Sequence, residues 1–345
     1  MLVVKARNVN IAYERGLRLL REHGVLEWSR AGMVLVVPQP VTTHYLVPTE
    51  RVLFDPVRDA NPFFHVMESV WMLSGSRDAR WLDAYVSDFS SRFAEDDGMA
   101  HGAYGHRWRM NFESSQWNQH SVLPDQLLLI GDMLLKDFAT RRAVLTMWDP
   151  GMDLGAQKND IPCNTHVYFR GHQTANKREV HISVCCRSND IAWGAYGANA
   201  VHMSVMGEVV AGLAGAHLGE YWQVSNNYHA YTNVLDRLAE STSEDPYWEF
   251  QSSDLVPIVS GETAEERRAS AVKILRDAEM FVSRRAPVYT RWFTEVVLPM
   301  AQVHTLWKAG STDEAVEHCH RIRSRDWRVA CERWMQRRIE RRRAR

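Results

Sequence analysis

Three strand-like segments follow one another in the middle of the chain, and segments of helical character lie on both sides of them. The three are RAVLTMW at 142–148, THVYFRG at 165–171 and EVHISVCCRS at 179–188. Residues 10–23 carry apolar side chains at helical spacing, and residues 198–216 are small and apolar without a proline, which predicts a buried helix. Because strands and helices do not alternate regularly, the pattern favours an α+β fold over a doubly wound sheet.

The patterning changes after the turn-like segment PIVSGET at 257–263. From about Thr263 onward the sequence is helical in character and has no strand signal. We therefore predict a larger α+β domain over residues 1–255 and a helical extension over residues 256–345.

The end of this extension is rich in arginine. From Arg321 it reads RIRSRDWRVACERWMQRRIERRRAR, while the whole chain has a formal net charge of -1. Such a segment suits either a solvated helix with a basic end, which we favour, or a surface that binds nucleic acid or another polyanion.

Composition excludes several classes of protein. The amino terminus lacks the features of a secretory signal, and no apolar run approaches about 18 residues, the length that spans a membrane. The five cysteines are scattered without metal-ligand spacing, which fits a reducing compartment. We expect a cytoplasmic protein with no membrane segment and no metal.

One cysteine stands at the start of a strand-like segment, in IPCNTHVYFR at 161–170. A cysteine there is either a small buried hydrophobic residue or a nucleophile, and a nucleophilic thiolate requires positive charge nearby. Arg187 and the Arg141–Arg142 pair could supply that charge, as could Arg30. Arg187 could instead pair with Asp190, whereas adjacent arginines have planar guanidinium groups that suit a phosphate.

Two further segments have the composition of ligand sites. RSNDIAWGAYGAN at 187–199 combines charge, amides and glycines, which is typical of a binding loop. QVSNNYHAYTN at 223–233 places His229 and Tyr231 two residues apart, on one face of an extended segment. Considered alone, His229 would be a structural histidine.

These segments together resemble the superfamily of thymidylate synthases and pyrimidine-nucleotide hydroxymethylases. The resemblance rests on the order of ATRRAVLTMW, PCN, RSND with its glycine loop ending in Asn, and NNYHAYTN. Upstream, MESVWMLSG resembles the family helix that carries a glutamate and a tryptophan, and GAYGHRWR resembles its Tyr-Gly-x-x-Trp-Arg turn. The resemblance covers residues 10–240 and implies a mixed sheet packed with helices.

The resemblance also implies a mechanism. Cys163 would attack C6 of a pyrimidine nucleoside monophosphate, so that C5 can attack the methylene carbon of 5,10-methylenetetrahydrofolate. Glu68 would organise the network of protons and water above the ring, and Tyr104 would assist proton removal from C5. Arg187 would bind the phosphate and stabilise the thiolate. The other implied nucleotide contacts are Arg30, Arg141, Arg142, Ser188, Asn199, His229 and Tyr231, with Arg141 and Arg142 reaching across a homodimer interface; the implied folate contacts are Asp190, Ser90 and Phe93.

Departures from the synthase pattern bear on the product. Ser90 stands where synthases have a tryptophan that shields the intermediate from water, and Phe93 corresponds to their second tryptophan. A hydroxyl group in place of an apolar shield leaves room for water. Synthases end in a short apolar tail, whereas this sequence runs on to RRRAR. We therefore expect a 5-hydroxymethyl product. The alternative is a thymidylate synthase in which other residues supply the shield.

The substrate base stays open at this stage. The glycine loop GAYGAN is one residue longer than in synthases, so either Ala198 or Asn199 stands at the base-reading position. An amide can serve uracil or, when flipped, cytosine. Asn164 replaces a common histidine, and the aspartate that marks deoxycytidylate hydroxymethylase is absent. We expect dCMP, CMP or dUMP as substrate; a non-catalytic nucleic-acid-binding protein on this fold is the remote alternative.

Overall fold

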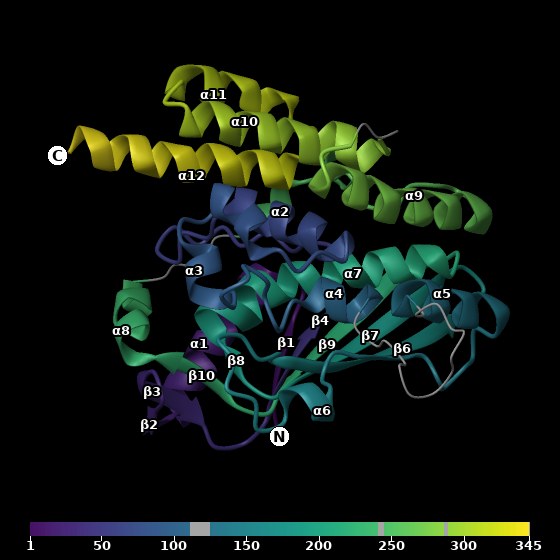
Figure 1. Ribbon diagram of the computed structural model, residues 1–345, viewed down its shortest axis with the longest axis horizontal. Helices are drawn as coiled ribbons and strands as arrows, with labels where there is room; N and C mark the ends of the chain where they lie inside the picture. Colours follow the sequence, from purple (N-terminus) through teal and green to yellow (C-terminus); the bar gives the residue numbers. More distant parts are fainter. Residues whose placement is uncertain (111–124, 241–244, 286–288, 345) are drawn as a thin grey trace.

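A six-stranded mixed sheet forms the base of the molecule (Figure 1). The computed structural model describes residues 1–110, 125–240, 245–285 and 289–344. The strand order is β1-β4-β9-β7-β6-β5, in which β1 is parallel to β4, β9 is parallel to β7 and the other neighbours are antiparallel. The strands are β1 Leu2–Ala6, β4 Val41–Tyr45, β5 Val144–Thr146, β6 Asn164–Gln173, β7 Arg178–Cys186 and β9 His217–Ser225.

A smaller four-stranded sheet has the order β2-β3-β10-β8. Its strands are β2 Val25–Ser29, β3 Gly32–Val37, β8 Asn189–Asp190 and β10 Tyr228–Tyr231. β10 runs parallel to β8, so that His229 is paired with Asp190. This sheet therefore brings together two segments that the sequence keeps about forty residues apart.

A layer of helices covers the large sheet, with α7 (Asn199–Leu213) lying across it (Figure 1). Every residue of α7 is buried, because α2, α5 and α9 pack around it. The other helices of the α+β part are α1 Val9–His23, α2 Pro62–Leu73, α3 Phe89–Phe93, α4 Tyr104–Arg109, α5 Gln126–Lys136, α6 Pro150–Asp153 and α8 Thr232–Leu235. Close approach of α4 to α2 requires Gly105, since a Cβ there would collide with the backbone of Met72. Tyr104 and Glu68 are thereby carried on two closely packed helices.

The carboxy-terminal extension forms a further layer over α2 (Figure 1). It contains α9 Ala264–Val282, α10 Leu298–Lys308, α11 Thr312–His318 and α12 Arg325–Arg343. One apolar core runs from the sheet through α2 into these helices. The boundary at residue 255 therefore stays a prediction, because the core does not divide there. None of the helices in the described ranges is long and apolar enough to cross a membrane.

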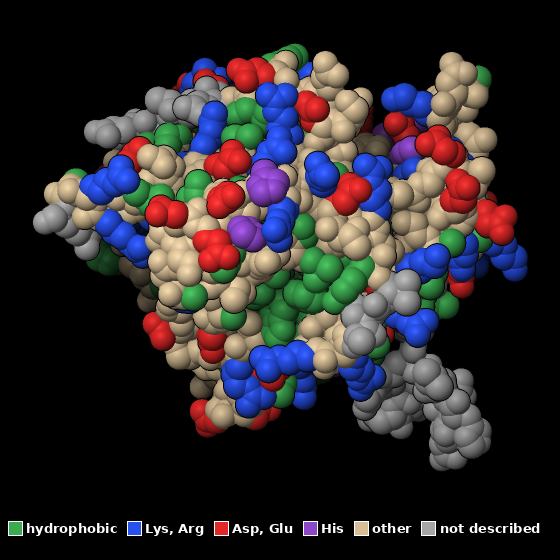
Figure 2. All heavy atoms as spheres, turned by 90° about the horizontal axis from the view of Figure 1, so that it is seen from above, with side chains coloured by type: hydrophobic (Ala, Val, Ile, Leu, Met, Phe, Trp, Pro, Cys, Tyr) green, Lys and Arg blue, Asp and Glu red, His purple; other side chains and the backbone are tan. Residues whose placement is uncertain are grey.

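Basic and acidic side chains are interspersed over the face that the extension presents (Figure 2). On α12, Arg337, Arg338 and Arg341 all lie on the single carboxylate of Asp59. Part of the arginine-rich segment is thus held against the α+β part of the chain. This arrangement fits a helix with a basic end better than a continuous surface for nucleic acid.

Most of the predicted elements are present, with two local differences. The three central strands and the buried helix are β5, β6, β7 and α7. The apolar spacing of residues 79–93 predicts a continuing helix. These residues instead form a 3-10 helix, Ala79–Ala84, and the short α3, because Asp88 between them adopts a left-handed backbone conformation with φ 59°. The glycines of HGAYGHRW, at 101–108, predict a turn, and this segment instead enters the helix α4 at Tyr104.

Candidate active site

Cys163 lies in the turn that leads into β6, and groups on both sides hold that turn. The hydroxyl oxygen of Tyr104 accepts hydrogen bonds from the backbone N–H groups of Cys163 and Asn164, each at 3.1 Å. On the other side, Arg187 donates from Nε to the carbonyl of Pro162 and from Nη2 to the carbonyl of Ile161. Among the described residues, the thiol itself makes only a weak 3.9 Å contact, with the backbone carbonyl of Ile161. Its turn is fixed, and its sulfur stays available for chemistry.

Burial and two neighbouring charged groups shift the pKa of Cys163. Burial raises the pKa of its thiol, the guanidinium of Arg187 lowers it, and the carboxylate of Asp160 raises it again. The net direction is upward, so Cys163 is a thiol when no ligand is bound. The positive charge expected near the cysteine is present, and it opposes burial without overcoming it.

Glu68, on α2, is the most strongly perturbed acid near the cysteine. Burial, together with the nearby Asp160, raises the pKa of Glu68 to about 8. Its Oε2 lies 3.2 Å from Nε2 of His202 on α7. Burial lowers the pKa of His202 to about 3, so at neutral pH this contact joins a protonated acid to a neutral imidazole and is not an ion pair.

A chain of amide side chains begins next to the cysteine. Asn164 donates from Nδ2 to Oδ1 of Asn199 at 3.0 Å, and Asn199 donates from Nδ2 to Oδ1 of Asn189 at 3.0 Å. Asn189 in turn donates to Gln223 and Ser225. The network fixes which end of the Asn199 amide is oxygen and which is nitrogen. Of the two candidates for the base-reading position, Asn199 is the one joined to the neighbour of Cys163.

His229 and Asp190 form a second polar group at the pairing of β10 with β8. Nδ1 of His229 and Oδ2 of Asp190 are both buried and have no hydrogen-bond partner among the described residues. The ring of Tyr231 lies 5.7 Å from that of His229. Buried polar atoms without partners are rare in proteins and indicate groups that a ligand satisfies.

The ion pair between Arg187 and Asp190, considered as an alternative, does not form. Arg187 bonds to the two carbonyls described above, and Oδ1 of Asp190 accepts instead from the backbone N–H groups of Ala192 and Trp193. Burial raises the pKa of Asp190. Ser188 lies half-buried between Arg187 and the small sheet.

Three of the expected arginines do not reach Cys163 within one chain. Arg30 is exposed at the tip of the β2–β3 hairpin. Arg141 and Arg142 are exposed just before β5. In the antiparallel pairing of β5 with β6, Val144 lies opposite Tyr168 and Thr146 opposite His166, so the arginine pair lies toward the far end of β6 from Cys163. Their phosphate contacts stay predictions.

The two expected folate contacts on α3 stay predictions as well. Ser90 is half-buried and donates from its backbone N and its Oγ to the carboxylate of Asp83, at 2.8 Å and 2.6 Å. Phe93 is 38% exposed and packs against Phe89. The hydroxyl oxygen of Ser90 keeps its lone pairs and can accept a hydrogen bond from water.

Two residues near the site were not singled out by the sequence. Asp160, three positions before Cys163, accepts a backbone hydrogen bond from Gly102, and burial raises its pKa. Its position so close to the cysteine was the signal that could have identified it. His202 gave no such signal, since a histidine in a small apolar helix resembles any buried histidine. No cluster that could hold a metal ion occurs in the part of the chain that the structure describes.

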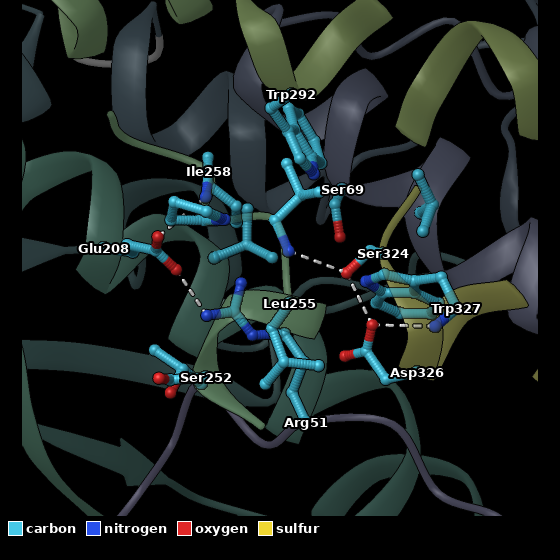
Figure 3. Close-up of a pocket in the computed structure, with 15 residues that line it drawn as sticks. Arg51, Ser69, Glu208, Ser252, Leu255, Ile258, Trp292, Ser324, Asp326 and Trp327 are labelled. Carbon is cyan, nitrogen blue, oxygen red and sulfur yellow. Dashed lines mark hydrogen bonds and ion pairs between the residues drawn. The ribbon is translucent and has the colours of Figure 1, made fainter. Parts of the chain in front are cut away.

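A cavity of about 250 Å³ lies elsewhere, between α2, α7 and the extension (Figure 3). Arg51 reaches across it to Glu208, while Ser324 and Asp326 bond to each other on the opposite side. None of the predicted site residues lines it. The cavity belongs to the junction with the extension and not to the Cys163 site.

This chain belongs to the thymidylate synthase family, because the family model described as thymidylate synthase matches residues 22–266. The predicted family and fold class are confirmed. The chain is 39% identical to the deoxyuridylate hydroxymethyltransferase of Pseudomonas phage M6, over 98% of this chain and 95% of that protein. It is 32% identical to the enzyme of the same name from Bacillus phage SP01, over 60% and 52% of the two chains, and 27% identical to that of Delftia phage PhiW-14, over 60% and 57%.

Proposed function

We propose that this chain is a deoxyuridylate hydroxymethyltransferase, which converts dUMP, 5,10-methylenetetrahydrofolate and water into 5-hydroxymethyl-dUMP and tetrahydrofolate. The predicted class, a one-carbon transferase of the thymidylate synthase family, is confirmed. Of the substrates that the sequence left open, the relative that matches nearly the whole chain favours dUMP. The observation that carries the proposal is the arrangement around Cys163, a half-buried thiol between Tyr104 and Arg187 and beside Asn199.

The chain's own residues support the first steps. The thiol of Cys163 loses its proton to water, Sγ bonds to C6 of the pyrimidine, and the electron pair of the C5–C6 double bond moves toward O4, which makes C5 a nucleophile. Oδ1 of Asn199 can accept from N3–H of uracil while Nδ2 donates to O4. His229 offers a sugar hydroxyl its Nδ1, which has no hydrogen-bond partner among the residues that the structure describes. Arg187 contributes positive charge toward the phosphate and toward the sulfur.

The residues present also fit the folate. Bound methylenetetrahydrofolate supplies a one-carbon unit at the oxidation level of formaldehyde. Asp190 keeps one buried carboxylate oxygen that no described residue hydrogen-bonds, which suits the amino and N–H groups of a pterin. Next to it, Trp193 is 59% exposed and has Arg58 stacked over its ring, an apolar and cationic surface for the rest of that molecule.

The product depends on whether water or hydride adds to the methylene carbon that C5 carries. Adding water to the methylene carbon on C5 gives the hydroxymethyl nucleotide without oxidation, whereas a hydride from the folate gives the methyl nucleotide and dihydrofolate. Ser90, bonded to Asp83, presents a polar hydroxyl where a tryptophan would exclude water. We propose that the water that adds to the methylene carbon is bound next to Ser90.

One experiment separates the alternatives. Incubating the full chain with methylenetetrahydrofolate and, in parallel, dUMP, dCMP or CMP should give 5-hydroxymethyl-dUMP by mass, with no absorbance change from dihydrofolate. A methyl product with dihydrofolate would identify a thymidylate synthase. Cys163→Ser is the matched control, and its activity should be lost.

We also propose that the active form is a homodimer. Arg141 and Arg142 are exposed and lie toward the far end of β6 from Cys163 in their own chain. A second copy would let the pair bind the phosphate in its neighbour's site. If so, mixing Cys163→Ser with a variant that lacks both arginines should restore part of the activity, because one mixed site is then complete.

A further inference from the structure

Glu68 and His202 face each other across two packed helices, α2 and α7. Oε2 of Glu68 lies 3.2 Å from Nε2 of His202, and the side chains are 10% and 1% exposed. Both atoms are buried, and within the described ranges neither makes a hydrogen bond, so each is the nearest unpaired polar atom left for the other. One proton between the two atoms satisfies both. No proton would leave two lone pairs facing each other, and two protons would leave two hydrogens in the same enclosed space.

The other side of the imidazole decides which residue carries that proton. The backbone of His65 partly offsets the effect of burial by raising the pKa of His202, which is the direction that a hydrogen-bond acceptor produces. The N–H of His65 already donates to the carbonyl of Asn61, so the group left for the ring is the His65 carbonyl oxygen, which can only accept. Nδ1 of His202 therefore carries the hydrogen, and Nε2 presents a lone pair to Glu68. The proton between the two residues must belong to Glu68.

The charges around the pair agree with this assignment. Burial and Asp160 both favour the protonated form of Glu68, and burial favours the neutral form of His202. On the α2 side, His65 is neutral as well, since burial, His202 and Arg58 depress its pKa. The groups that face the pair thus leave it uncharged at neutral pH.

We propose that His202 is a positioning residue for Glu68: its neutral Nε2 accepts the carboxyl proton and keeps Glu68 in the acid form until Cys163 adds to the pyrimidine. This inference rests on the proposed function. When Sγ bonds to C6 and the electron pair moves to O4, the proton passes from Glu68 to O4, directly or through water. Glu68 is left as the carboxylate, and His202 stays uncharged throughout.

The test is a ¹³C NMR titration of the full ligand-free chain carrying carboxyl-labelled glutamate, with Glu68 assigned by the signal lost in Glu68→Gln. His202→Phe keeps a ring without an acceptor. His202→Asn keeps a donor for the His65 carbonyl and is too short to reach Glu68, and His202→Gln restores an acceptor oxygen. His304→Phe is the control, because His304 is also buried and neutral, with a pKa of about 4, and it packs on Phe63 and Tyr85 instead.

The wild-type midpoint of Glu68 should lie near 8. His202→Phe and His202→Asn should lower it by about one pH unit, the size expected for losing one buried hydrogen bond, and His202→Gln should restore most of the shift. His304→Phe should leave it unchanged. The alkaline limb of turnover with dUMP should move with the midpoint in each variant.

Two outcomes would overturn the proposal: a wild-type midpoint in the ordinary range of an exposed glutamate, or an unchanged midpoint in both His202→Phe and His202→Asn. The NMR titration uses no substrate, so it separates this proposal from the proposed function. Normal titration behaviour in a chain that makes no 5-hydroxymethyl-dUMP would reject the reaction and keep the Glu68–His202 pair. The reverse result would reject only the role of His202.

Discussion

The backbone N–H of Arg187 donates to the carbonyl oxygen of Cys163 at 2.8 Å. The end of β7 is therefore bonded directly to the residue that carries the thiol. Because the guanidinium of Arg187 also bonds to the two carbonyls before Cys163, one residue controls both the shape of the turn and the charge on the sulfur.

Replacing Arg187 should make the thiol less reactive. In Arg187→Gln, burial continues to raise the pKa of Cys163 while the opposing positive charge is gone, so the pKa should rise further. Each unit of that rise lowers the thiolate fraction about tenfold below the pKa. The rate of alkylation by iodoacetamide across pH 7 to 10, minus the rate in Cys163→Ser, measures the effect. Arg178→Gln, at the opposite end of β7 from Arg187, should not alter the profile; an unaltered profile in Arg187→Gln would contradict the prediction.

The reacting residues were predictable because they lie in short segments with distinctive composition. PCN, RSND and NNYHAYTN each mark a strand end or loop, and the fold brings these ends together around Cys163 and His229. Their hydrogen-bond partners were predictable only in part. Tyr104 was expected to act on C5 of the substrate, and in the ligand-free chain it also holds the turn of the nucleophile.

The residues that set protonation could not be predicted in this way. His202 acts through its contact with α2, and a helical periodicity does not reveal which buried side chains meet across two helices. The break at Asp88 was also hidden, because its left-handed conformation is a local backbone choice inside a segment with helical spacing. Contacts of Arg141 and Arg142 with a second chain lie outside what one chain can show.

Glu68 should make the chain less stable as pH rises. Its pKa is about 8 when folded, above the ordinary value of 4.5, so the folded state binds a proton more tightly than the unfolded state does. That contribution is fully present below about pH 4.5 and is lost as pH rises through about 8, by a few kcal/mol. Urea unfolding at pH 5 and pH 8 should therefore show a smaller loss of stability in Glu68→Gln than in wild type. Equal losses in the two proteins would show that the folded state does not raise the pKa of Glu68.

The junction with the extension should depend on the buried pair of Arg51 and Glu208 (Figure 3). Oε1 of Glu208 accepts from the backbone N–H of Ile258, in the segment that leads into α9. In Arg51→Met, Glu208 remains as a buried charge without a counter-ion, and we expect a loss of about 3–5 kcal/mol in the free energy of unfolding. The double variant Arg51→Met with Glu208→Gln should lose less, because no charge is stranded. Denaturant unfolding of Arg51→Met, Glu208→Gln and the double variant gives the comparison, and additive losses would argue against the pairing.

Asn199 should decide between uracil and cytosine. Its Nδ2 donates to Asn189 and its Oδ1 accepts from Asn164, so the amide has a fixed direction and keeps one hydrogen and one lone-pair position for a base. In Asn199→Asp the donor is lost, which leaves O4 of uracil without a partner, whereas a carboxylate can accept from the N4 amino group of cytosine. Losing one buried hydrogen bond costs about 1–3 kcal/mol, roughly a 10- to 100-fold change in rate. We expect kcat/KM for dUMP to fall by that factor while the value for dCMP rises.

Steady-state kinetics with both nucleotides measure the two kcat/KM values. Asn226→Asp is the control, because Asn226 lies in an exposed turn between β9 and β10. A parallel fall for both nucleotides would mean that Asn199 supports the loop and does not read the base.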